Sequence, residues 1–328
     1  SLFNSRVMFS FDAYLKETRD MLVKASIPIT SGFEDTTTTY TNAGKVRNQG
    51  IEMSLHTINL TGELGWETNL TATYNKNKIK DLNSDVPYYI NQINNSYVTM
   101  LAKDYPINVF YGYVTDGIFQ NQSEVNTHAV QPGAEPGDIR FKDLNHDGVL
   151  DENDKTWIGN PYPDLMVGLN LGFNYKNFDF TANFYGTFGN DIFNKTKGLY
   201  SGVSGQNVWA GTLEKAWHGE GTSNDIPRLS YNDLNQNYTR VSSFFVEDGS
   251  YMRCKLLQIG YTLPKKLLRG TELRLSFSAQ NPFTITGYSG MDPERPQIGN
   301  NGSVIETGID GIAYPNPRTF LFGIDFKF

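Results

Sequence analysis

The chain has 328 residues and a formal net charge of −7, with 28 Lys and Arg against 35 Asp and Glu. This acidic balance argues against a nucleic-acid-binding protein, because such proteins carry a basic patch or stripe. Only 19% of the residues are charged and 13% are aromatic. No stretch approaches the run of about 18 apolar residues that a membrane-spanning helix needs. Composition therefore excludes helical membrane proteins and leaves open a β-rich chain with aromatic side chains on one face.

The cysteine count and the first residues narrow the possibilities further. The single cysteine, Cys254, cannot form an intrachain disulfide bond, so we expect it to be a small apolar residue within a strand. The chain begins at Ser1 and reaches a strand-like segment at 6–15 without a leader sequence. We therefore expect a mature or truncated product.

Alternation of apolar and polar residues is the strongest pattern in the chain. Successive side chains of a strand point to opposite faces of the sheet, so a period of two predicts β-structure. Runs of this kind occur near 7–15, 66–75, 165–176, 178–188 and 272–280. The last residues show it best, with one face formed by Phe320, Phe322, Ile324, Phe326 and Phe328. The fold class predicted is all-β and antiparallel.

Two architectures produce this pattern, and the connections between strands distinguish them. In a soluble sandwich the apolar face forms a core, whereas in an outer-membrane barrel it faces lipid and the polar face lines the lumen. Tight turns are expected near 61–63, 104–106, 176–177 and 264–270. Long loops are expected near 26–42, 81–94, 119–162, 190–249 and 282–315. Short turns that alternate with long loops are typical of transmembrane barrels, so the barrel is favoured.

Placing the short turns in the periplasm gives each strand a direction. Upward strands are predicted near 5–23, 64–80, 107–118, 177–189 and 270–281, and downward strands near 43–60, 95–103, 164–176, 249–263 and 317–328. The C-terminus then lies in the periplasm, and the terminal Phe328 fits the C-terminal aromatic residue of such barrels. About ten strands can close a small barrel. Because the loops are long for a small barrel, and an open sheet edge is not stable in lipid, we expect further strands from outside this sequence.

Residues 143–154 have the spacing of a calcium-binding loop. The expected oxygen ligands are Asp143, Asn145, Asp147, the backbone carbonyl of Val149, Asp151 and Asp154. Gly148 occupies the position where such loops turn sharply. No helical pattern flanks both sides, so we expect a structural Ca²⁺ and not a sensor. The alternative is an acidic loop with Asx turns and no metal.

Several short motifs occur in order along the chain. The longest is PGDIRFKDLNHDG at 136–148, which continues through IGNPYPD at 158–164. The others are VRNQGIE at 46–52, FYGY at 110–113, TDGIF at 115–119, GNDIFN at 189–194, VEDGSYMR at 246–253 and PNPR at 315–318. Together they resemble the SusC/RagA-type TonB-dependent transporters of Bacteroidetes, from about the first strand to Phe328.

This resemblance implies a barrel of about 22 strands with an N-terminal plug, to which the chain contributes the last ten or so strands. It implies an outer-membrane importer of oligosaccharides or peptides, powered through TonB, with a SusD-like surface lipoprotein as a lid. The plug, the TonB-contacting segment and the first strands are expected outside this sequence. Residues 136–164 would form an extracellular loop that carries the calcium motif.

Candidate binding residues lie in the longest loop. Trp209, Trp217 and Tyr231 either stack on sugar rings and contact the lipoprotein lid, or pack a small core within the loop itself, together with Tyr200 and Tyr238. A further motif, MDPERP at 291–296, is expected to set the shape of its loop.

Catalysis has little support in the sequence. The histidines are isolated from the spacing of a zinc site, and no G-x-S-x-G elbow or phosphate-binding glycine loop is present. We therefore expect no enzyme. Two function classes remain, an outer-membrane importer and a secreted or surface β-sandwich that binds ligands and holds a structural calcium.

Overall fold

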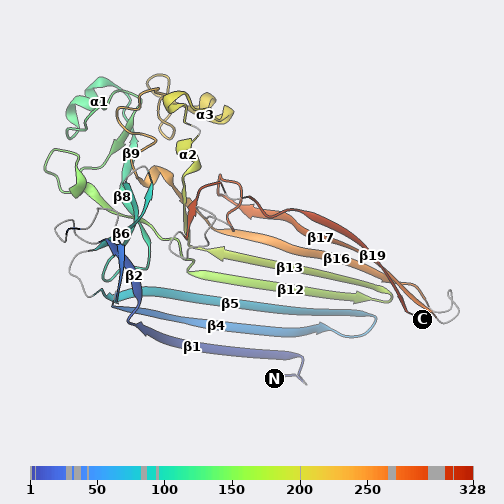
Figure 1. Ribbon diagram of the computed structural model, residues 1–328. Coiled ribbons are helices and arrows are strands. Elements are labelled where there is room, and N and C mark those ends of the chain that lie inside the picture. The colour runs from blue at the N-terminus through green and yellow to red at the C-terminus, as the bar shows by residue number, and fades with distance from the viewer. Residues whose placement is uncertain are drawn as a thin grey trace.

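One antiparallel sheet of eight long strands dominates the structure, and Figure 1 shows it as a curved layer. The computed structural model describes residues 2–3, 5–26, 32, 38–42, 44–82, 87–93, 96–199, 201–264, 271–294, 307–312 and 314–327. In spatial order the strands are β1 (Val7–Arg19), β4 (Lys45–Leu60), β5 (Leu64–Asp81), β12 (Leu165–Tyr175), β13 (Phe178–Phe188), β16 (Tyr251–Thr262), β17 (Glu272–Thr286) and β19 (Thr319–Lys327). The spatial order follows the chain order, as in the wall of an up-and-down barrel.

The pairing of these strands confirms the two faces predicted from the alternation. Phe173 of β12 lies opposite Trp66 of β5 and Phe180 of β13. The ring centroids of Phe173 are 5.6 Å from those of Trp66 and 6.1 Å from those of Phe180. Asn170, three residues earlier on the other face, lies opposite Asn183. The sheet therefore has one aromatic face and one polar face.

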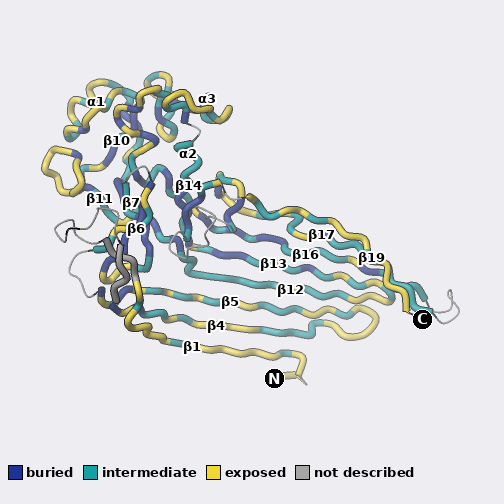
Figure 2. The backbone as a smooth tube through the Cα atoms, viewed as in Figure 1, coloured by how far each residue is buried: buried dark blue, intermediate teal, exposed yellow. Residues whose placement is uncertain are grey.

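Within the described residues, nothing covers the apolar face of the sheet. Phe322 is 84% exposed, Ile324 75% and Phe320 61%. Figure 2 shows intermediate and exposed residues along most of the sheet and buried residues gathered in the loops at one end. A sandwich would need a second sheet packed about 10 Å from this face, and the described part of the chain contains none. The arrangement favours a lipid-facing barrel sheet over a sandwich.

Two of the ten predicted barrel strands are wrong. The segments predicted near 95–103 and 107–118 form β7 (Ser96–Leu101) and β8 (Val109–Tyr113), which belong to a separate four-stranded sheet with β6 (Tyr88–Ile93) and β11 (Lys155–Gly159). The sheet instead passes directly from β5 to its antiparallel neighbour β12.

Length and burial explain this error. β7 has 6 residues and β8 has 5, fewer than the roughly 9–11 that a strand needs to cross a bilayer. Four successive residues of β7, 98–101, are buried, so both of its faces pack against protein. The predicted periplasmic turn at 104–106 is therefore at the loop end, where the Asp104 N–H donates to the carbonyl of Ile79 on β5. One upward and one downward strand are lost together, so the relative directions of the other eight are unchanged.

The sheet does not close on itself, because β1 and β19 stand at its opposite edges. An open edge has backbone groups that lipid cannot satisfy, which agrees with the expectation that further strands complete the barrel. Cys254 lies on β16 with its side chain buried, as predicted. Phe328, which we expect to be the C-terminal aromatic residue of the barrel, lies outside the described residues.

The long loops fold into a second region at one end of the sheet, which we call the loop body (the described residues of 82–164, 189–250 and 287–318). Both chain termini lie at the other end, with the short turns (Figure 1). Besides the four-stranded sheet, its elements are β9 (Thr115–Ile118), β10 (Ile139–Phe141), β14 (Asp191–Asn194), β15 (Val246–Asp248), β18 (Ile309–Asp310), α1 (Gln122–Thr127), α2 (Thr196–Leu199), α3 (Ala210–Lys215) and the 3₁₀ turns 152–154, 203–205 and 243–245. The earlier loop contributes the hairpin of β2 (Leu22–Ser26) and β3 (Thr38–Asn42).

The loop body has a hydrophobic core of its own. Phe110, Phe193, Phe245 and Ile309 come from three loops and are each at most 3% exposed. The Phe193 ring lies 5.9 Å from Phe110 and 5.2 Å from Phe245. Full burial of a large apolar side chain contributes about 1.5–3 kcal/mol, so this cluster holds the three loops together. No helix of the described residues is long and apolar enough to cross a membrane.

Candidate functional site

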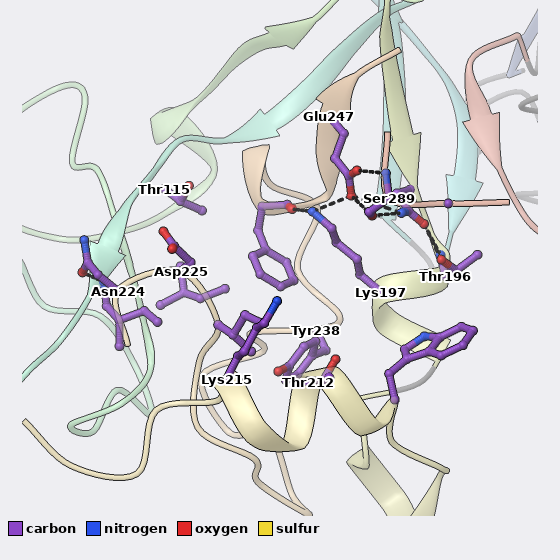
Figure 3. A pocket seen from close by; sticks show the side chains of 18 of the residues that line it. Thr115, Thr196, Lys197, Thr212, Lys215, Asn224, Asp225, Tyr238, Glu247 and Ser289 are labelled. Carbon is purple, nitrogen blue, oxygen red and sulfur yellow. Dashed lines mark hydrogen bonds and ion pairs between the residues drawn. The ribbon is translucent and has the colours of Figure 1, made fainter. Parts of the chain in front are cut away.

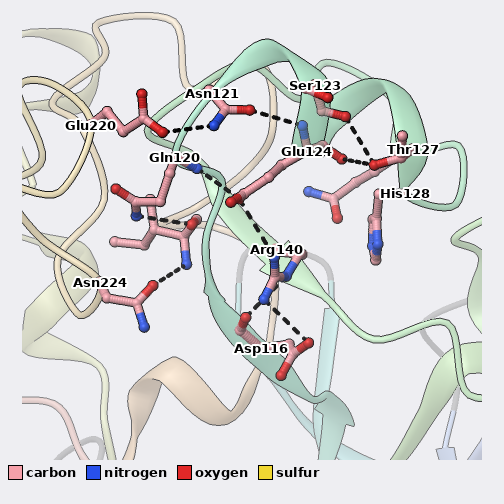
Figure 4. Close-up of polar contacts among 12 residues, drawn as sticks. Asp116, Gln120, Asn121, Ser123, Glu124, Thr127, His128, Arg140, Glu220 and Asn224 are labelled. Carbon is pink, nitrogen blue, oxygen red and sulfur yellow. Dashed lines mark hydrogen bonds and ion pairs between the residues drawn. The ribbon is translucent and has the colours of Figure 1, made fainter.

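The motifs TDGIF and GDIRF lie side by side as the paired strands β9 and β10. Arg140 of β10 bonds the Asp116 carbonyl through Nε at 3.0 Å and approaches the Glu124 carboxylate at 3.5 Å (Figure 4). Asn121 caps α1 by accepting the Glu124 N–H at 3.1 Å, and its Nδ2 donates to Glu220 at 2.8 Å. Glu220 lies in the next long loop, so these polar contacts join two loops of the loop body.

A buried carboxylate, Asp138, fixes the same two loops more firmly. Its side chain is fully buried and accepts hydrogen bonds from Arg228 Nε at 2.8 Å and Asn237 Nδ2 at 2.9 Å. The hydrogen bond from Arg228 to Asp138 outweighs burial and raises the pKa of the Arg228 guanidinium. Since Asp138 belongs to the PGDIRF motif, this motif has a structural role as the anchor of the 190–249 loop.

A cavity of about 860 Å³ opens between the three loops of the loop body (Figure 3). Its volume is within the range of about 300–1,000 Å³ typical of ligand sites. The lining is mixed: Ile118, Ile139, Ile226 and Phe244 are apolar, and about half of the other lining residues are polar or charged. This cavity is the candidate binding site.

One side of the cavity carries a charge pair from the 190–249 loop, with a serine of the last loop beside it. Lys197 Nζ lies 2.9 Å from Glu247 Oε1, and Ser289 donates its hydroxyl to the same oxygen at 2.8 Å. Burial alone would raise the pKa of Glu247, but the Lys197 ammonium and the Ser289 donors outweigh it and hold the pKa below its usual value. Glu247 is therefore ionised, and the ammonium of Lys197 compensates its negative charge.

Two further charged residues line the cavity without such compensation. In the described part of the chain, neither the ammonium of Lys215 nor the carboxylate of Asp225 has a hydrogen-bond or ion-pair partner. Lys215 ends α3, and Figure 3 shows its ammonium extending from that helix into the space between the lining segments. The cavity thus presents one free positive and one free negative group.

A second ionic cluster lies where the loop body meets the sheet. Arg253 of β16 pairs with Asp292 and with Glu294, each at 2.5 Å, and the two carboxylates also accept from Asn316. Lys255 contacts Glu294 as well. The side chains of Arg253 and Asp292 are 5% and 2% exposed. The MDPERP motif thus does more than shape a loop, because its carboxylates bind the last loop to the barrel strand.

The structure separates the three aromatic residues predicted to bind substrate or lid. Trp209 is 49% exposed and lines the cavity. Trp217 packs within the loop body: its Nε1 donates to Gln120 at 3.2 Å, and a Cβ at Gly137 would lie 2.3 Å from its ring. Tyr231 is 67% exposed and does not line the cavity. Their role in binding substrate or lid stays a prediction.

The predicted calcium loop folds as a series of turns. Asp143 accepts the N–H of His146 at 2.7 Å and of Gly148 at 2.9 Å, while Asn145 and Asp151 each accept an N–H two residues on. The carboxylate of Asp154 is buried and accepts the N–H groups of residues 144 and 151 at 2.8 and 2.9 Å.

These contacts use the oxygens that the metal would need. Burial opposes ionisation of Asp143, but the N–H donors of Gly148 and His146 lower its pKa, so it is charged. Among the described residues no three Asp, Glu, His or Cys side chains are gathered closely enough to hold a metal ion. The side chains of Asp143, Asp147 and Asp151 would have to turn from backbone donors to the ion, and the calcium site stays a prediction.

Sequence reasoning missed most of the cavity. Lys197, Lys215, Asp225 and Glu247 lie in no motif that indicates binding, and Ser289 comes from a different loop. No local signal marks them, because the contacts between the loops bring them together. The Asp292–Arg253 pair had a partial signal, because both residues belong to motifs of the sequence, MDPERP and VEDGSYMR.

Comparison with known proteins agrees with this geometry. The family model described as "TonB dependent receptor-like, beta-barrel" matches residues 1–134. TonB-dependent receptor P3 of Formosa agariphila is 34% identical over 339 residues, which cover 100% of this chain and 33% of that protein. TonB-dependent receptor SusC of Bacteroides thetaiotaomicron is 28% identical over 347 residues, with coverages of 99% and 30%.

A solved structure described as that of the RagAB peptide transporter superposes over 99% of this chain with a TM-score of 0.76. Over its whole length the chain resembles the β-barrel of the SusC/RagA-type TonB-dependent receptors. The identity to the RagAB chain is 24%, so that likeness shows the shared fold, and the superposition covers 34% of that chain. The chain spans about a third of the length of the curated relatives it matches. The resemblance predicted from the motifs is confirmed.

Proposed function

We propose that the chain is part of an outer-membrane importer that takes up oligosaccharides or peptides with energy delivered through TonB. The main support for this proposal is the uncovered apolar face of the eight-stranded sheet. In a transmembrane barrel such a face points outward and contacts lipid. The loop body would lie on the extracellular side, and the short turns and the end of β19 in the periplasm. The plug and the remaining strands would come from the rest of the transporter. No chemical step is involved.

The proposal includes a SusD-like surface lipoprotein above the loop body. Large apolar side chains exposed on the loop body offer contact area to such a partner. Leu213, Leu234 and Tyr231 are 64%, 65% and 67% exposed. SusC relatives and the RagAB description fit an importer of this kind.

Uptake by whole cells tests the importer. Deletion of the gene should abolish uptake of the labelled substrate, and loss of TonB should do the same while leaving the protein in the outer membrane. The purified protein should need detergent and remain rich in β-structure. A soluble, monomeric and folded protein in plain buffer would contradict the proposal and favour the secreted β-sandwich module.

We also propose that the 143–154 loop binds Ca²⁺ as a structural ion. The ligand spacing supports this, together with the φ of +85° at Gly148 that permits the turn. Adding a chelator should lower thermal stability and expose the loop to proteolysis, and Asp143→Asn should remove this response. Glu152→Gln, a charge change in the same loop at a position that supplies no expected ligand, should preserve it. If a chelator changes neither thermal stability nor proteolysis of the loop, the proposed calcium site is wrong.

A further inference from the structure

The apolar face of β5 carries an aromatic residue near each end. Trp66 and Tyr74 lie 74 − 66 = 8 residues apart on that face, opposite Phe173 and Leu165 of β12. At about 3.3 Å per residue and a strand tilt of about 40°, this separation corresponds to about 20 Å along the barrel axis. The lipid-facing band of a transmembrane barrel is about 25 Å tall and has aromatic girdles at both interfaces. Trp66 and Tyr74 therefore fit the two edges of the lipid-facing band on this strand.

Basic side chains begin directly beyond Tyr74, on the side of the loop body. On the same face of β5, Lys76 and Lys78 follow Tyr74, and β4 places Arg47 opposite Lys78. The strands β1, β4 and β5 are neighbours at one edge of the sheet (Figure 1). Two residues of a tilted strand rise by about 5 Å, and the headgroup layer on each side of a bilayer is about 5–7 Å thick. Lys76 therefore lies at the level of the lipid headgroups.

Basic residues outnumber acidic ones in this region, which we call the basic belt (Arg19, Lys45, Arg47, Lys76, Lys78, Lys80 and Lys103). The carboxylates near them are Glu17, Asp81, Asp104 and Asp164. Asp104 illustrates the excess: its carboxylate lies 2.9 Å from Lys78 Nζ, and the hydrogen bond from Lys78, together with two further lysines, lowers the pKa of Asp104. One carboxylate cannot compensate three ammonium groups. The basic belt is thus positive, in a chain whose net charge is −7.

The loop ends of β12, β13 and β17 differ from the basic belt. On the apolar face these strands reach the loop body with Leu165, Phe188 and Ile285, which are uncharged. Ile285 is 66% exposed, so the apolar face continues there to the end of the strand. The positive charge is therefore a property of one edge of the sheet and not of the loop ends in general.

Lysines at the border of an apolar surface match one kind of ligand. A ligand at this place meets Ile51 and Tyr74 on the side of the lipid and the ammonium groups of Lys76 and Lys78 on the side of the loop body. It needs an apolar part and a negative headgroup, one beside the other. A free anion lacks the apolar part, whereas a phosphorylated lipid has both. Basic residues beside a membrane surface attract anionic lipids in this way.

We propose that the basic belt binds the phosphate groups of an anionic lipid in the outer leaflet. The acyl chains contact Ile51 and Tyr74, and the phosphates pair with Lys76, Lys78 and Lys80. Lys76 Nζ lies 5.6 Å from the centroid of the Tyr74 ring, which holds this ammonium at the border of the apolar face. The inference rests on the proposed outer-membrane position with the loop body outside, and it adds a lipid site that is independent of the imported substrate.

Titration of the whole transporter, purified in detergent and stripped of lipid, tests this site. The probe is fluorescently labelled lipid A, a bisphosphorylated glycolipid, and its dephosphorylated form is the matched control ligand. We expect lipid A to bind at least tenfold more tightly than the dephosphorylated form, and its affinity to fall as salt screens the charges. Inorganic phosphate at the same phosphate concentration should not displace lipid A, because it has no acyl chains to contact the apolar face.

Variants locate the site on the barrel. Lys76→Gln and Lys80→Gln should each weaken lipid A binding about fivefold, the usual contribution of one basic residue beside an anionic lipid surface. Lys76→Arg, which keeps the charge, should bind normally. Lys176→Gln is the matched control, because Lys176 also lies over a tyrosine ring, that of Tyr175 at 5.2 Å, but in the short turn at the opposite end of the sheet. It should bind lipid A normally, and heat-induced loss of barrel mobility on gels should be the same for all variants.

Several results would overturn the lipid site. These are equal affinity for the dephosphorylated form, displacement by inorganic phosphate, unchanged affinity in both glutamine variants of the basic belt, or an equal loss in Lys176→Gln. Whole-cell uptake separates this failure from failure of the importer. TonB-dependent uptake by a protein whose lipid A binding ignores the basic belt would overturn the lipid site alone. Binding that depends on the basic belt, in a protein without TonB-dependent uptake, would overturn the importer alone.

Discussion

The eight-stranded sheet and the loop body follow opposite rules of burial. On the sheet, Phe320 and Phe322 expose most of their surface, although they belong to a regular strand. In the loop body, Phe110, Phe119 and Phe141 are fully buried, although they lie in or beside strands of at most five residues. The sheet needs lipid to cover its apolar face, whereas the loop body folds around its own core as a soluble domain does.

This difference teaches that regular alternation and burial are separate properties in this chain. Long alternating strands mark the part exposed to lipid, and short strands buried on both faces mark the part packed within protein. β7 shows the consequence, because its apolar residues look like a barrel strand in the sequence but are buried on both faces. The predictions below test each region and the contact between them.

The largest effect is expected at the contact between the two regions. Arg253→Met leaves Asp292 and Glu294 without their guanidinium, and removing one partner of a buried ion pair costs about 3–5 kcal/mol in free energy of unfolding. Heat-induced loss of folded barrel mobility on gels, with limited proteolysis of the last loop, measures the loss. The control Arg274→Met removes a partner of Asp179 that is 27% exposed, and should cost less than about 1 kcal/mol. Equal losses would show that burial at this contact is unimportant.

The lipid face gives the next largest effect. Phe322→Arg places a charge in the hydrocarbon and should cost about 2–4 kcal/mol near the bilayer midplane. Leu321→Arg, the adjacent residue on the polar face of β19, should be tolerated. Folding yield in lipid vesicles measures both. If the two variants fold equally well, β19 does not have the lipid-facing side assigned to it.

A substitution in the loop body should leave the sheet intact. Gly137→Ala forces a Cβ to within 2.3 Å of the Trp217 ring at a φ of +90°, and overpacking of this kind costs about 1–3 kcal/mol. Faster proteolysis of the 190–249 loop at unchanged barrel mobility is the expected result. Gly211→Ala, in α3 with nothing within 4 Å of the new Cβ, is the control and should not destabilise the loop body. Loss of the barrel itself would contradict the independence of the two regions.

The smallest effect is a pH dependence of the loop body. The pKa of Glu247 is lowered in the folded state, so the folded state binds fewer protons than the unfolded state. The stabilisation is therefore present above the ordinary pKa of about 4.3 and is lost as the pH falls through the lowered folded pKa. Proteolysis of the loops as a function of pH measures it. Glu247→Gln should remove this component, and an unchanged profile would exclude Glu247 as its source.

Much of the barrel sheet was predictable from the sequence, because the period of two is a local property of strand geometry. Leu169 and Phe184 alternate with Asn170 and Asn183 within their own strands, and the structure pairs them face to face. The motifs were equally local, and they identified the family before any contact was known. The same reasoning failed for β7 and β8, because a short apolar run in the sequence does not show whether lipid or protein covers it.

The cavity was beyond prediction for a related reason. Lys215, Asp225 and Glu247 lie on different segments of one long loop, and Ser289 comes from the last loop. Only Trp209 of the predicted aromatic residues lines the cavity, because Trp217 is packed against Gly137. The calcium spacing was visible in the sequence, but whether its carboxylates turn to an ion or to backbone N–H groups depends on the folded loop.

The sequence by itself determined the strand faces, the acidic and aromatic character of the chain and its resemblance to the SusC/RagA-type receptors. The tertiary structure decided which strands join the barrel sheet, which carboxylates meet Arg253, and which charged groups of the cavity stay without a partner among the described residues. The physical reason is one of range: alternation and turns are fixed by neighbouring residues. Ion pairs and cavities depend on which distant segments pack together, and burial of Phe110, Phe193 and Ile309 sets that packing.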